Sequence, residues 1–151
     1  MTNPMTTPSH FHTVRFLIVD DDEVSVMAIT RSMNKLNVAN PVSVAKNGVE
    51  ALAHLENAIQ ENGGALPPYV ITLDLNMPRM GGLEFLERVR NDPRLQKLSI
   101  FVLTTSDAPG DIASAYEKNI AGYIVKESPL EGLKNAIAML RDYATLVVLP
   151  S

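Results

Sequence analysis

The sequence predicts an α/β protein built on a five-stranded parallel sheet with helices on both faces. Five short apolar, largely β-branched runs alternate with five segments in which apolar residues recur at helical spacing. Continuous apolar runs of this kind indicate strands that are buried on both faces. Because strands and helices alternate and crossovers are right-handed, a doubly wound sheet is the expected architecture.

Each element has its own local evidence. Strands are expected at 15–19, 42–44, 69–74, 98–103 and 122–125, and helices at 23–36, 82–91, 109–118 and 129–143. A further helix follows Asn47, which is an N-cap with Glu50 three residues later, and ends near residue 61. Ser128-Pro129-Leu130-Glu131 is a second capping box, with proline at the first helical position.

The length of 151 residues suits one domain with a full hydrophobic core. No internal repeat and no long linker divides the chain. The expected domain spans residues 14–144, between a flexible tail at 1–13 and an apolar tail at 145–151.

Composition excludes several classes of protein. The formal net charge of −4 argues against a general nucleic-acid binder, which needs cationic contacts to phosphate. Without cysteine there is no disulfide framework and no thiolate metal site. No apolar run reaches the length of a membrane span, and the first 13 residues lack the pattern of a signal peptide. The expected compartment is therefore the cytoplasm.

Carboxylates follow two of the predicted strands. The run Phe16–Val19 ends in Asp20 and Asp21, and the run that begins at Tyr69 ends at Asp74. If these strands are neighbours, the three carboxylates converge, and like charges about 4 Å apart repel by roughly 4 kcal/mol. A divalent cation would offset that repulsion, and hard oxygen ligands suit Mg²⁺.

Four motifs, each closing a strand, resemble the response-regulator receiver domains of two-component signalling. The similarity covers residues 14–144 and implies a flavodoxin-like sheet in the order 2-1-3-4-5. The matching residues are Val19-Asp20-Asp21, Leu73-Asp74-Leu75-Asn76-Met77-Pro78, Thr104, and Gly122-Tyr123-Ile124-Val125-Lys126.

The resemblance implies a role for each motif residue. Asp74 would be the phosphoacceptor, a nucleophilic carboxylate that takes a phosphoryl group from a phosphohistidine. Asp20, Asp21, Asp74 and the backbone carbonyl of Asn76 would hold Mg²⁺. Thr104 and Lys126 would bind the phosphoryl oxygens, and Thr104 with Tyr123 would form a switch. The side chains of Asn76, Thr105 and Ser106 would tune the lifetime of the phosphate. Asp22 and Glu23 fit an N-terminal helix cluster better than the site.

The chain departs from the receiver pattern at two positions. Glu127 follows the lysine where most receivers have a proline in a cis peptide, and a non-proline cis bond costs about 2.5–4 kcal/mol. The Lys126–Glu127 bond is therefore either cis at that cost or trans with Lys126 placed differently. Thr105 is larger than the alanine, glycine or serine commonly found there, and would restrict access of water to the phosphate.

Two other functions remain as alternatives. A phosphohydrolase of the haloacid dehalogenase type would need a second aspartate two residues after the first, where this chain has Asn76. A receiver-like interaction module that is never phosphorylated typically lacks an acidic residue or the lysine, and this chain has all of them. No G-x-G-x-x-G motif follows the first strand, which disfavours a dinucleotide-binding fold.

The expected protein is a single-domain regulator and not an enzyme, apart from weak Mg²⁺-dependent phosphorylation and dephosphorylation of itself. Its expected partner is a sensor histidine kinase or a histidine phosphotransfer protein, with neither nucleic acid nor membrane. The downstream target is unknown. The apolar stretch Thr145–Pro150 either folds back onto the domain or extends a homodimer interface on the last helix and fifth strand.

Overall fold

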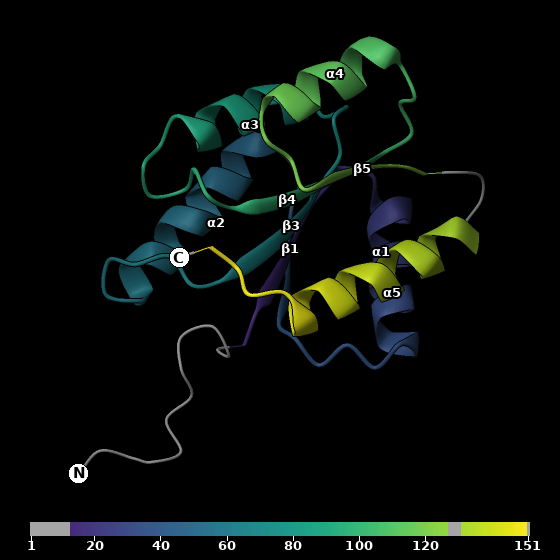
Figure 1. Ribbon diagram of the computed structural model, residues 1–151, viewed down its shortest axis with the longest axis horizontal. Helices are drawn as coiled ribbons and strands as arrows, with labels where there is room; N and C mark the ends of the chain where they lie inside the picture. Colours follow the sequence, from purple (N-terminus) through teal and green to yellow (C-terminus); the bar gives the residue numbers. More distant parts are fainter. Residues whose placement is uncertain (1–12, 127–130, 151) are drawn as a thin grey trace.

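The computed structural model describes residues 13–126 and 131–150, without the side chains of Glu131 and Gly132. Five parallel strands form one sheet in the order β2-β1-β3-β4-β5, which confirms the predicted topology (Figure 1). The strands are β1 (Arg15–Val19), β2 (Val42–Ala45), β3 (Tyr69–Leu73), β4 (Ser99–Thr104) and β5 (Gly122–Val125).

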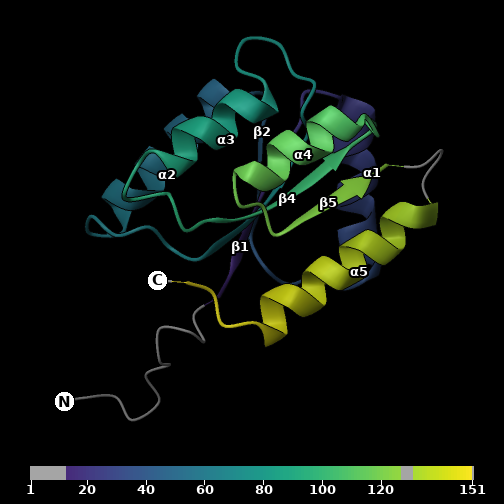
Figure 2. The same ribbon diagram turned by 45° about the horizontal axis from the view of Figure 1, so that its top comes forward.

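Helices cover both faces of this sheet. They are α1 (Glu23–Lys35), α2 (Gly48–Glu61), α3 (Gly82–Arg90), α4 (Pro109–Glu117) and α5 (Glu131–Leu146). Figures 1 and 2 show α2, α3 and α4 on one side and α1 with α5 on the other. Two hydrophobic clusters fill the two interfaces, one under each group of helices. Every residue of β3 and β4 is buried, as expected for central strands of a doubly wound sheet.

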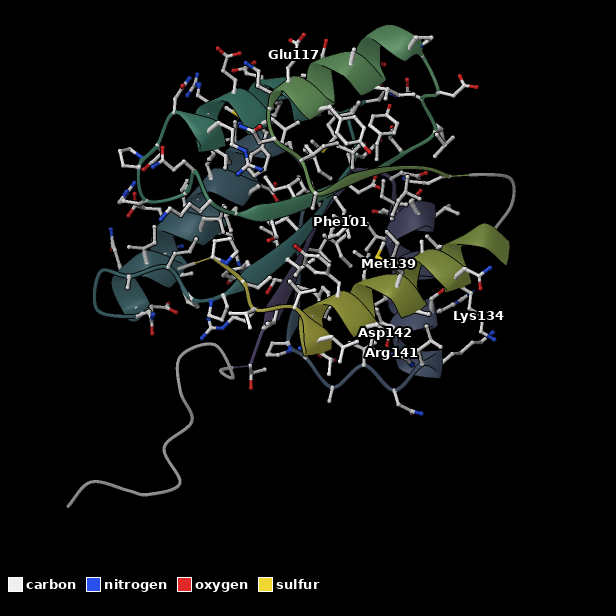
Figure 3. The ribbon with its side chains drawn as sticks, viewed as in Figure 1. Phe101, Glu117, Lys134, Met139, Arg141 and Asp142 are labelled. Atoms are coloured by element: carbon white, nitrogen blue, oxygen red, sulfur yellow. The ribbon has the colours of Figure 1, made fainter. Side chains whose placement is uncertain are left out.

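Element boundaries agree with the predictions to within a residue or two, except at α5. This helix continues to Leu146, three residues beyond the predicted end. Tyr143 anchors the added turn, because its ring packs edge-on against Phe101 with centroids 5.0 Å apart. Figure 3 labels Phe101, which lies on β4 and faces α5. Thr145 and Leu146, predicted to lie in the tail, are therefore helical.

The last residues run back from α5 toward the end of α2 (Figure 1). Leu149 packs against the cluster between the sheet and α5. Val148, Leu149 and Pro150 also line a pocket of about 660 Å³ together with Tyr69 and Ser99, at the N-terminal ends of β3 and β4. Leu146 and Val148 remain 78% and 65% exposed, so the tail is only partly covered by its own domain.

Three predictions fall on residues outside the described part of the chain. They are the flexible tail, of which only Thr13 is described, the capping box that begins at Ser128, and the Lys126–Glu127 peptide bond. Within 13–126 and 131–150, no helix is long and apolar enough to cross a membrane.

Candidate functional site

The predicted acidic cluster forms at the carboxyl ends of β1 and β3. Val19 and Leu73 are paired in the parallel ladder, so the residues that follow them emerge side by side. One oxygen atom each from Asp20, Asp21 and Asp74 lies within 4.8 Å of the other two. Asp20 and Asp74 are buried, whereas Asp21 is exposed. Three convergent carboxylates are a donor set that fits a hard divalent cation such as Mg²⁺.

Backbone hydrogen bonds fix the two buried aspartates. The Asp20 amide donates to the Ala45 carbonyl at 3.0 Å, and the Asp74 amide donates to the Val19 carbonyl at 2.9 Å. Asp22 does not join the cluster, because it caps α1 and accepts from the Val24 amide at 3.1 Å. Its placement agrees with the interpretation of Asp22 as a helix-end residue.

Lys126 brings a cation to the cluster from the end of β5. Its Nζ lies 2.8 Å from Asp20 Oδ2 and 3.2 Å from Ser25 Oγ, and both charged side chains are largely buried. Burial raises the pKa of Asp20, while the bonds from Lys126 and the Asp22 amide oppose that rise and the charge of Asp74 adds to it. Lys126 is thus the cation that pairs with the buried carboxylate of Asp20 in this structure.

Thr104 forms a direct hydrogen bond with Asp74, the candidate phosphoacceptor. Its fully buried hydroxyl donates to Asp74 Oδ1 at 2.7 Å, whereas neighbouring Thr105 is exposed. The sequence alone does not show which of the two adjacent threonines contacts Asp74, and in the structure it is Thr104. Asn76 lies with its side chain exposed and its amide 3.5 Å from Asp74 Oδ1.

Tyr123 is half-buried in β5 and points toward the loop between β4 and α4. Its phenol donates to the Ser106 carbonyl at 2.8 Å, and its backbone amide donates to the Tyr116 hydroxyl at 3.2 Å. Burial raises the pKa of Tyr123. The two residues of the predicted switch, Thr104 and Tyr123, thus both contact Ser106 in this loop.

Two residues at the site were not predicted from the sequence. Ser25 is the second acceptor for Lys126, and it lies in the first turn of α1. Gly82 opens α3, where an added Cβ would lie 2.6 Å from the Asp74 carbonyl oxygen. The available signal for Gly82 is its place in a Gly-Gly pair after the Pro-containing loop, a pattern that marks a turn but does not indicate the contact with Asp74.

Comparisons with known proteins place this geometry in one family. The sequence model of the response regulator receiver domain family matches residues 16–138 of this chain. The chain is 30% identical over 127 residues to the probable methanogenesis regulatory protein FilR2 of Methanothrix harundinacea, covering 84% of this chain and 81% of that protein. It is 26% identical over 127 residues to the response regulator Rcp1 of Synechocystis, with 84% and 86% covered.

Solved structures give the same result. The Mn²⁺-bound form of Rcp1 matches with a TM-score of 0.78 at 25% identity, over 92% of this chain and 99% of that one. The phosphorylated cyanobacterial phytochrome response regulator RcpA matches with a TM-score of 0.79 at 29% identity, over 93% and 99%. With the family model matched over most of its length, this chain belongs to the response regulator receiver domains of two-component signalling.

Proposed function

We propose that the protein accepts a phosphoryl group from a phosphohistidine onto Asp74 and signals this state by protein contact. The observation that supports the proposal best is the environment of Asp74, which is buried beside Asp20 and Asp21 and bonded by Thr104. A folding role does not need three convergent carboxylates, since their repulsion destabilises the fold. The donor would be a histidine kinase or phosphotransfer protein of the same cytoplasmic pathway.

The proposed reaction needs alignment more than covalent help. A carboxylate oxygen of Asp74 attacks phosphorus, the phosphorus–nitrogen bond of the donor breaks, and its imidazole leaves with the electron pair. Mg²⁺, held by Asp20, Asp21, Asp74 and the Asn76 carbonyl, would supply positive charge against the carboxylates and the transferred group. Lys126 would turn from Asp20 to a phosphoryl oxygen. The Thr104 hydroxyl would donate a hydrogen bond to another phosphoryl oxygen.

Incubation with acetyl phosphate or phosphoramidate should add the mass of one phosphoryl group in the presence of Mg²⁺ and none in EDTA. Asp74→Asn should abolish the gain, because an amide oxygen is a poor nucleophile. Asp107→Asn is the matched control, since Asp107 is an exposed carboxylate in a neighbouring loop. Intact-mass spectrometry measures the result, and unchanged labelling of Asp74→Asn contradicts the assignment.

A long phosphate lifetime is the next expectation. Thr105 adds bulk next to Thr104, and the Ser106 hydroxyl is committed to Asp111 at 2.6 Å, so it does not orient a water toward phosphorus. The amide of Asn76 is the only other predicted tuning group. Thr105→Ala should therefore lose the phosphoryl group several-fold faster than the wild type. The decay of the labelled mass measures this, and an unchanged half-life removes the steric explanation.

The homodimer stays a prediction. It is supported by the exposed apolar side chains of Leu146 and Val148, and of Met139 on α5, which Figure 3 labels. Sedimentation velocity with and without beryllofluoride tests it, and a monomer under both conditions contradicts it.

A further inference from the structure

Ser106, in the loop between β4 and α4, connects three elements of the fold through its polar groups. Its carbonyl accepts from the Tyr123 phenol at 2.8 Å, and its hydroxyl donates to Asp111 Oδ2 at 2.6 Å. The same hydroxyl accepts from the Ala108 amide at 3.3 Å, and the Ser106 amide points at Thr104 Oγ1 from 3.5 Å. One loop residue thus contacts β4, β5 and the start of α4.

The start of α4 lacks an ordinary cap. The residue at its N-cap, Ala108, has no side-chain oxygen, and Pro109 at the first helical position has no amide hydrogen. Asp111 lies in the first turn, where a carboxylate interacts favourably with the helix dipole. Its Oδ2 accepts instead from the Ser106 hydroxyl, at a distance typical of a strong charge-assisted bond. This contact joins the first turn of α4 to the loop.

The loop in turn sets the environment of Thr104. The Thr104 hydroxyl has one hydrogen, which it gives to Asp74 Oδ1, so its oxygen is the acceptor for the Ser106 amide. A chain of polar contacts therefore runs from Asp74 through Thr104 and Ser106 to Asp111. A movement of the loop would therefore shift the Ser106 amide that donates to the Thr104 hydroxyl.

We propose that Asp111 is a positioning residue for the phosphoryl site. Through Ser106 it holds the β4–α4 loop where the Thr104 hydroxyl can meet a group on Asp74. Hydrogen-bond donors bind a charged group better when they are already ordered, because the cost of ordering them has been met beforehand. The inference rests on the proposed function, since it concerns the affinity of the same site for a phosphoryl group.

The test compares beryllofluoride affinity, at saturating Mg²⁺, in the wild type and in single variants. Asp111→Ala should weaken binding about 5- to 20-fold, within the usual range of coupling between sites. Asp111→Asn keeps an acceptor oxygen for the Ser106 hydroxyl, and its affinity for beryllofluoride should stay within about 3-fold of the wild type. Asp107→Ala is the matched control, because it removes an exposed carboxylate from the same loop and should leave the affinity unchanged. Isothermal titration calorimetry measures all four proteins.

A double-mutant cycle with Ser106→Ala tests whether Asp111 acts through its contact with Ser106. If Asp111 acts through Ser106, the double variant should bind no more weakly than the weaker single variant. Additive losses would contradict the proposal, as would an Asp111→Ala protein that binds as tightly as the wild type. If the wild type itself binds no beryllofluoride, the proposed function fails. A wild type that binds beside an unaffected Asp111→Ala shows that only this inference is wrong.

Discussion

Replacing Arg90 by methionine should lower the free energy of unfolding by about 3–5 kcal/mol. Arg90 ends α3 and is half-buried, and burial lowers its pKa. Its guanidinium donates to four backbone carbonyls at 2.7–3.0 Å, those of Gln96, Leu98, Lys118 and Asn119. Each hydrogen bond from a charged group contributes about 1.5–3 kcal/mol, and bonds from one side chain are not additive.

Two of those carbonyls belong to residues just past the end of α4, where helix carbonyls have no partner within the helix. Methionine keeps the aliphatic stem but leaves the carbonyls without a donor. Arg88→Met is the matched control on the same helix, because Arg88 pairs with Glu84 at 3.5 Å and both side chains are exposed. Its loss should stay within about 0.5 kcal/mol. Equal losses in urea unfolding of the two variants would show that the four bonds contribute nothing specific.

Arg90 also marks a limit of what the sequence predicts about the fold. The strands were predictable because they are short apolar runs with a polar residue at or just after their end, as where Asp20 follows Val19 and Asp74 follows Leu73. The partners of Arg90 lie up to 29 residues away along the chain, and no local pattern indicates them. The extra turn of α5 depends likewise on the distant contact between Tyr143 and Phe101.

The candidate site likewise has a part that the sequence predicts and a part that it does not. Asp20, Asp21 and Asp74 were predictable because parallel strands bring their carboxyl ends to one edge of the sheet. The family resemblance indicated Thr104 and Lys126 as site residues, but it did not indicate the hydrogen bonds that they make in this structure. The sequence does not indicate that Lys126 pairs with Asp20 and Ser25, since residues more than 100 positions apart meet there. Side-chain partners of this kind depend on the packed structure.

Lys126→Met should destabilise the metal-free protein by about 3–5 kcal/mol near neutral pH, because it leaves the buried charge of Asp20 without its cation. The loss should be smaller near pH 4. The pKa of Asp20 is already raised by burial, and removing Lys126, which opposes that rise, raises it further. The folded variant then binds a proton more tightly than the unfolded chain. This stabilisation is complete below the ordinary pKa of aspartate and is lost as pH rises through the folded value.

Mg²⁺ should also reduce the loss, since a cation among the three carboxylates replaces the missing positive charge. Phosphorylation by phosphoramidate should nevertheless fall about 100-fold or more, as when one charge-stabilising donor is removed from an active site. Lys118→Met is the matched control, because Lys118 pairs with exposed Glu87 at 3.2 Å and its loss should be within about 1 kcal/mol at either pH. Urea unfolding at about pH 4 and about pH 7.5, in EDTA and in MgCl₂, measures the stabilities. If Lys126→Met loses the same stability under all four conditions, the loss arises from side-chain packing and not from an uncompensated carboxylate.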